Sequence, residues 1–249
     1  MLDIILNLLN FENPFFVLAA GLLLGLIHSF EPDHVGAMST QLLRKSESDI
    51  HSIKLKKITL NSSIKGIFWG LGHTSSIILL GIAITGLSIN MTVDFFSGAE
   101  VIVGFMLIGL AMLTILNKRL FSQQHIHPHS HGDKIHTHPH SHTGSHEHTH
   151  KSLLIGCIHG IAGSGSIVVL AASSSNNFES SVMFLVIFGI GSILGMGAIS
   201  GLLGMQFALL SKIGKFNLYF RYLVSAATLA IGINIVYEIF SDSGSLLPF

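Results

Sequence analysis

The sequence predicts an all-α polytopic membrane protein with six transmembrane helices. Three observations carry this prediction. Of the 249 residues, 49% are hydrophobic and only 10% are charged, and the mean hydropathy is +0.64. The chain contains six apolar runs close to the roughly 20 residues that a helix needs to cross about 30 Å of hydrocarbon. All 13 Lys and Arg residues lie in alternate connections between these runs.

The first apolar run, residues 15–43, is long and carries polar residues near its middle. No basic residue precedes it, which argues against a cleaved signal peptide, so we expect this span to be retained. The remaining spans are expected at residues 66–87, 99–116, 153–172, 181–203 and 222–240.

The basic residues predict the orientation of the spans. Lys and Arg occur only between spans one and two, three and four, and five and six. Cytoplasmic loops of membrane proteins hold the excess of Lys and Arg. We therefore expect a multi-pass protein of the cell membrane with these three connections in the cytoplasm and both termini outside.

Residues 117–152 form a connection that divides the chain into two membrane regions, 1–116 and 153–249. Between positions 125 and 150, 11 of 26 residues are His, and most others are Ser, Thr, Pro or Gly. With no apolar face to bury, this segment is expected to be disordered. Imidazole binds nickel, cobalt, zinc and copper alike, so we interpret the loop as a cytoplasmic metal buffer or selectivity funnel. The alternative is a solvated spacer.

The two membrane regions resemble each other over short stretches. GLIH at 25–28 recurs as GCIH at 156–159, and FWGLGH at 68–73 resembles IFGIGS at 187–192. With three spans in each half, such a repeat is inverted. Inverted repeats are frequent in transporters, whose substrate sites lie near the membrane midplane on broken helices.

Four ionisable residues, His28, Glu31, Asp33 and His34, lie inside the first apolar run. An ionisable residue at the centre of a membrane helix costs about 2.5–3.5 kcal/mol even on insertion scales, so four together indicate a function. Imidazole and carboxylate are also ligands that divalent first-row transition metals accept. The segment is therefore a candidate metal site.

Pro32 decides whether these side chains can meet. On a regular helix, Asp33 and His34 would lie roughly 140° and 240° around the axis from His28 and would point apart. Proline lacks an N–H and clashes with the carbonyl four residues earlier, and it biases the preceding residue away from helical angles. We expect a helix break at Pro32 that brings the three side chains together. The alternatives are a kinked helix whose polar residues satisfy one another, or an earlier exit from the membrane.

Two further histidines lie in apolar runs, His73 in the second and His159 in the fourth. Either alone is more often a hydrogen-bonded interior residue than a ligand. Together with His28 they place an intramembrane histidine in each of three spans, which favours a shared site. Glu31 is expected to add negative potential or to support a ligand. The candidate metal residues are His28, Glu31, Asp33, His34, His73 and His159.

These motifs resemble the nickel/cobalt transporter family. The resemblance rests on His28-(x)4-Asp33-His34, on LGHT at 71–74 and on the His-rich loop. EPDH at 31–34 and HGIAGSG at 159–165 are most similar to its six-span branch of urease-accessory-type membrane proteins. The resemblance implies movement of Ni²⁺ or Co²⁺, with His28, Asp33, His34 and His73 as ligands. It also implies a metallochaperone, or urease or hydrogenase maturation proteins, as candidate partners.

We therefore expect a secondary transporter and not an enzyme. No Gly-rich phosphate loop is present, so transport is expected to use an ion gradient or a separate energising partner. The expected partners are divalent metal ions and the lipid bilayer, not nucleic acid, and no resident cofactor is expected. Uptake is favoured, and efflux stays open because Ile27 stands where the eight-span uptake permeases usually have Arg. Two other classes remain: a membrane enzyme or electron-transfer protein holding metal or haem, and a non-transporting accessory subunit that delivers metal for enzyme maturation.

Overall fold

The computed structural model describes residues 14–43, 55–89, 92–116, 125–131, 134–140, 147–163, 178–210, 213 and 216–244. A π-helix, Ile82–Gly86, continues α5, and two strands, β1 (His125–His131) and β2 (Lys134–His140), pair antiparallel. The α-helices are α2 (Pro14–His28), α3 (Pro32–Leu42), α5 (Leu55–Gly81), α6 (Val93–Ile115), α7 (Glu147–Gly163), α9 (Phe178–Leu210) and α10 (Phe216–Gly244).

Among the described residues, four stretches of helix are long and apolar enough to cross a membrane: Leu55–Gly86, Asp94–Ile115, Phe178–Leu210 and Leu218–Ser241. They contain the fifth and sixth expected spans, and they cover the second and third except for the last residue of each. The fourth expected span begins in α7, which has 17 residues and ends at Gly163, and its remainder lies outside the described residues. The structure thus supports a helical membrane protein, while the count of six spans and the repeat stay predictions.

The first expected span is interrupted at the position that Pro32 indicates. Helix α2 ends at His28 and α3 begins at Pro32, and Glu31 between them has an extended backbone with φ −57° and ψ 142°. Pro32 occupies the first helical position, where a missing N–H costs nothing. The carbonyl of His28 instead accepts a hydrogen bond from the N–H of Glu31 at 3.1 Å. A short turn therefore separates two helices with different directions.

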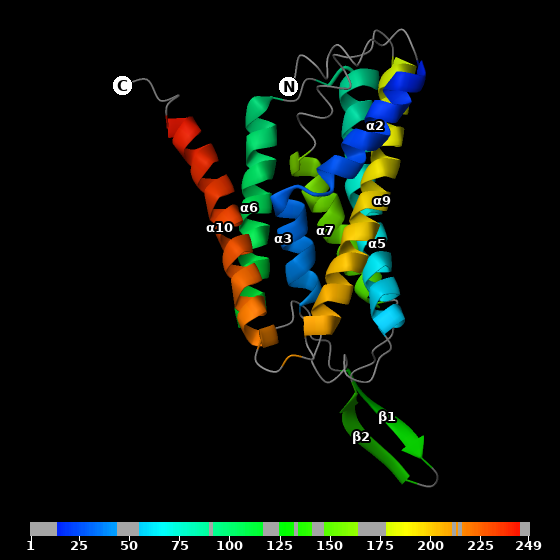
Figure 1. The fold of residues 1–249 in the computed structure, drawn as a ribbon, viewed down its shortest axis with the longest axis vertical. Coiled ribbons are helices and arrows are strands. Elements are labelled where there is room, and N and C mark those ends of the chain that lie inside the picture. Colours follow the sequence, from blue (N-terminus) through cyan, green and yellow to red (C-terminus); the bar gives the residue numbers. More distant parts are fainter. Residues whose placement is uncertain are drawn as a thin grey trace.

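Helices α5 and α9 pack along each other more extensively than any other described pair. Helix α5 packs against α9 and α7, α2 packs against α9, and α6 pairs with α10. Helix α3 joins these groups through contacts with α6, α9 and α10, and Figure 1 shows it between α6 and α7. Small residues allow the close approach of the helices. A Cβ at Gly66 of α5, for example, would collide with the carbonyl of Met196 on α9.

Two short segments of the His-rich connection are described as paired strands. Strands β1 and β2 form a hairpin in which His125 pairs with His140 and His131 pairs with Lys134. Helix α7 begins at Glu147, inside the range 117–152 expected to be loop. Strand geometry repeats every two residues, as the histidines here do, and the argument from composition did not use this period. The described membrane regions are helical, and the one two-stranded hairpin belongs to the connection between them.

The hairpin lies at one end of the helical bundle and extends away from it (Figure 1). Helix α2 begins, and α10 ends, at the opposite end of the bundle in the same view. The first and last described helices thus have their outer ends on the side away from the His-rich strands.

Candidate metal centre

All six predicted residues lie around the break between α2 and α3. His28 ends α2, Asp33 and His34 belong to the first turn of α3, His73 lies on α5, and His159 lies on α7. His28 is 5% exposed and the other three histidines are 0% exposed. The backbone turn before Pro32 therefore lets the side chains of His28 and His34 approach each other, whereas on a regular helix they would point apart.

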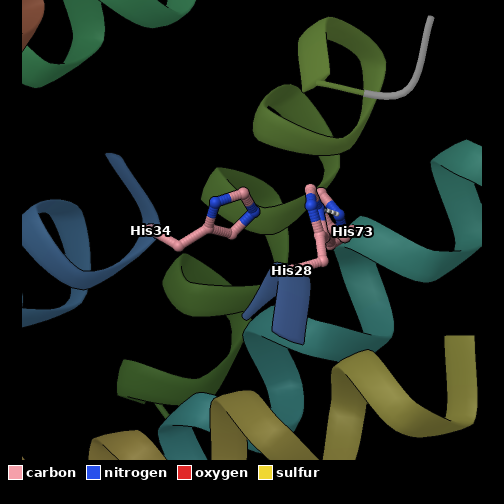
Figure 2. A group of neighbouring side chains, drawn as sticks. All are labelled: His28, His34 and His73. Atoms are coloured by element: carbon pink, nitrogen blue, oxygen red, sulfur yellow. Dashed lines mark hydrogen bonds between the residues drawn. The ribbon is translucent and has the colours of Figure 1, made fainter. Parts of the chain in front are cut away.

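The first ligand group consists of His28, His34 and His73, which offer one ligand atom each, all within 4.8 Å of one another. The Nε2 atoms of His28 and His73 are 3.0 Å apart, and Figure 2 shows the His34 ring opposite them, on its own helix. A metal–nitrogen bond of about 2.0–2.1 Å places adjacent donors roughly 3.0–3.4 Å apart. The spacing between His28 and His73 thus suits two ligands of one ion.

The second ligand group consists of Asp33, His34 and His159, again within 4.8 Å. Oδ1 of Asp33 lies 2.9 Å from Nδ1 of His34 and accepts a 2.8 Å hydrogen bond from the backbone N–H of His34. Oδ2 of Asp33 lies 2.9 Å from Nε2 of His159. One carboxylate therefore contacts two imidazoles from different helices.

Glu31 contacts the first group from outside. Its side chain is 51% exposed, and its Oε1 lies 2.9 Å from Nδ1 of His28. Its Oε2 lies 3.9 Å from Nδ1 of His34. A carboxylate that accepts the Nδ1 proton of a histidine orients the ring and leaves the Nε2 lone pair for a ligand bond. Glu31 is therefore placed where it could orient His28, and this role stays a prediction.

Three buried histidine nitrogens in the described part of the chain lack a hydrogen-bond partner: Nε2 of His34, Nδ1 of His73 and Nδ1 of His159. A buried polar atom without a partner costs about 1–3 kcal/mol. A cluster of polar residues that merely satisfy one another would not leave three such atoms. These histidine nitrogens are therefore available to a bound ligand or to further hydrogen bonds.

Two aromatic side chains line the centre and were missed as site residues. The ring centroid of Phe188 lies 5.3 Å from that of His28, and the ring centroid of Trp69 lies 5.7 Å from that of His159. Both are buried. The match between the two halves of the sequence could have identified them, because it aligns Trp69 in FWGLGH with Phe188 in IFGIGS. Apolar surroundings exclude solvent and strengthen the interaction between an ion and its ligands.

The donor set favours borderline divalent transition metals. Imidazole suits Zn, Cu, Fe and Ni, whereas thiolates and thioethers select Cu(I). Cys157 is the single cysteine of the chain, and its Sγ lies 4.0 Å from Oγ of Ser75, outside both groups. The centre thus offers imidazole and carboxylate donors.

Comparison with known proteins gives one informative relative. The chain is 31% identical over 224 residues to the urease accessory protein UreH of Bacillus sp. (strain TB-90). The matched region covers 90% of this chain and 91% of that protein. No family model matches the chain, and no solved structure matches it.

Proposed function

Because the chain belongs to the urease-accessory-type branch of the nickel/cobalt transporter family, we propose that it moves Ni²⁺ or Co²⁺ across the cell membrane through the buried His/Asp centre, with uptake as the favoured direction. The observation that carries this proposal is the convergence of His28, His34 and His73, from three helices, at a buried point within the bundle. Ionisable residues at membrane depth mark ion pathways.

The proposed topology has six crossings in a three-plus-three inverted repeat. Equivalent contacts in the two halves support the repeat. A Cβ at Gly25 on α2 would collide with the carbonyl of Phe188 on α9, and a Cβ at Gly156 on α7 would collide with the carbonyl of Trp69 on α5. The internal match pairs Gly25 with Gly156 and Trp69 with Phe188. A second pair of equivalent contacts joins Gly191 to Leu22 and Gly72 to Leu153.

The proposed orientation places the hairpin in the cytoplasm. It is supported by the restriction of every Lys and Arg to three alternate connections, since cytoplasmic loops hold the excess of these residues. The arrangement in Figure 1 is compatible with it, because α2 begins and α10 ends away from the hairpin. An ion taken up through the centre would leave it toward the His-rich strands.

The test of the proposed function is radioactive nickel movement in cells expressing the wild type, His28→Ala or an empty vector. Ser225→Ala is the matched control, since Ser225 is buried on α10 and its hydroxyl donates only within its own helix, to the carbonyl of Arg221. Accumulation above the vector that is lost only in His28→Ala supports uptake. Depletion below the vector, lost in the same variant, establishes efflux through the same centre.

Equal nickel content in wild type and vector would contradict transport and favour an accessory or enzymatic role. Purified protein in sealed vesicles separates these outcomes further. Nickel movement by the purified chain alone would exclude a purely accessory subunit, and a retained cofactor with a visible spectrum would indicate the enzyme or electron-transfer class.

We predict that replacing residues 125–140 by a Gly/Ser linker of equal length weakens nickel transport without abolishing it. The His-rich strands lie away from the buried centre (Figure 1), so their loss removes a local store of ions but no ligand of the centre. The initial rate should fall most at low nickel concentration. Complete loss of transport, with the protein still in the membrane, would contradict the buffer role.

Substitution Glu31→Gln is expected to raise the Kd for nickel about 10- to 100-fold, the usual cost of losing a group that orients a metal ligand. The amide keeps the size of the side chain but removes the charge beside Nδ1 of His28. The control is Glu179→Gln, since Glu179 is exposed at the start of α9. Calorimetric titration of the purified proteins measures the effect, and equal affinities in both variants would refute the orienting role.

A further inference from the structure

His34 is the one residue that belongs to both ligand groups of the described chain. Its ring centroid lies 4.5 Å from that of His28 on one side and 4.3 Å from that of His159 on the other. A neutral imidazole has a single acceptor nitrogen. His34 can therefore serve an ion in one group or in the other, but not two ions at once.

The five ligand residues do not surround one point. Their ligand atoms form two groups of three among the described residues, and His34 alone is common to both. The ring centroids of His73 and His159 are 6.1 Å apart. The other ligands come from separate helices: α2 and α5 provide His28 and His73, whereas α7 provides His159.

We propose that the centre is a two-position relay in which a single divalent ion passes from one group to the other while it remains bound to His34. Position one is His28, His34 and His73, and position two is Asp33, His34 and His159. The bonds to His28 and His73 break as the bonds to Asp33 and His159 form, and the ion keeps its charge. The relay deepens the proposed transport function and rests on it.

A hydrogen bond that forms within a group after the ion has left lowers the free-energy cost of moving the ion to the other group. Nε2 of His28 and Nε2 of His73 lie 3.0 Å apart, and Nε2 of His159 lies 2.9 Å from Oδ2 of Asp33. Each pair is at hydrogen-bonding distance, so the pair that the ion vacates can close on itself. A buried polar group without a hydrogen bond is costly. Because the vacated pair avoids this cost, the free energies of the ion at the two positions differ less.

Two positions on different helices also suit alternating access. His28 and His159 occupy matched places in GLIH and GCIH, on helices that pack against different partners, α2 on α9 and α7 on α5. A shift of α2 and α9 against α5 and α7 would separate His28 from His73 and so loosen position one. Rocking of two repeats about a central site is the usual motion of inverted-repeat transporters.

The test compares two full-length variants: one lacks both private ligands of position one, and the other lacks His159, one of the two private ligands of position two. The first is the double variant His28→Gln and His73→Gln, and the second is His159→Gln. All are made in a background in which the histidines of residues 125–150 are replaced by Asn, so that the hairpin does not bind nickel. Equilibrium nickel binding is measured on the purified chains, and nickel movement is measured in vesicles.

The relay predicts one ion per chain in the background protein and in both variants, with Kd changed by no more than about 10-fold, and loss of movement in both variants. Loss of the ion in either variant at an unchanged melting temperature would mean a single composite site and overturn the relay. Continued movement in either variant, or two ions bound at once in the background protein, would also overturn it.

A second substitution keeps the test decisive when a Gln variant unfolds. His28→Asn with His73→Asn, and His159→Asn, replace the same ligands with a smaller side chain, and the melting temperature of each chain is compared with that of Ser225→Ala. If the wild type moves no nickel, the proposed function fails, whereas the binding measurements alone still decide whether two positions exist.

Discussion

Substitution of His34 by Ala is expected to abolish nickel transport, with a loss of more than about 100-fold, beyond the effect of removing a group that only supports a ligand. His34 is 0% exposed and belongs to both ligand groups. Its removal leaves two ligands in each group and takes one imidazole partner from Asp33, whose Oδ1 contacts Nδ1 of His34 at 2.9 Å. Neither position would then hold an ion in a three-ligand site.

The measurement is the initial rate of radioactive nickel movement, with membrane abundance determined in parallel. Ser225→Ala should retain the wild-type rate because it alters a buried hydroxyl on α10, which contributes no ligand residue. Comparison with His34→Gln separates the loss of the imidazole ligand from the loss of side-chain packing, since Gln fills much of the same volume. Wild-type rates in His34→Ala would refute the assignment of the centre as the ion path.

Substitution Gly25→Ala is expected to destabilise the protein and to abolish transport. The added Cβ would collide with the carbonyl oxygen of Phe188 and lie 2.9 Å from the backbone N of Ser192. Both are backbone atoms of α9, so no side-chain rotation relieves the overlap. Overpacking costs about 1–3 kcal/mol and occasionally more. Helix α2 would have to move away from α9 and carry His28 out of position.

The matched control for this prediction is Gly109→Ala on α6, where an added Cβ would meet nothing within 4 Å. Since Ala is about 1 kcal/mol better than Gly within a helix, Gly109→Ala should leave the melting temperature unchanged or raise it. Thermal melting followed by size-exclusion chromatography in detergent measures both variants. Equal melting temperatures for the two variants would contradict the close packing of α2 on α9.

The break in the first span was predictable because its cause is local. Pro32 removes one backbone donor and restrains Glu31, and both effects act within one helical turn of the residues concerned. The same local argument identified His28, Asp33 and His34 as residues that could converge. In the structure His28 and Asp33 each share a ligand group with His34, but the two groups are different.

The contacts between helices could not be predicted from the local sequence. Sequence reasoning named His73 and His159 but did not assign them to different ligand groups. That division depends on how α5 and α7 are rotated relative to α3. The rotation follows from close packing, such as that of Gly156 on α7 against the backbone of Trp69 on α5.

The sequence by itself determined the helical membrane character, the break at Pro32 and the set of side chains available to a metal ion, because composition and backbone chemistry act locally. The tertiary structure alone decided that His34 is shared, that His28 faces His73 while His159 faces Asp33, and that Phe188 and Trp69 line the centre. The physical reason is that ligand distances are set by the packing of helices distant in the chain. A rotation of one helix changes these distances without altering any local pattern.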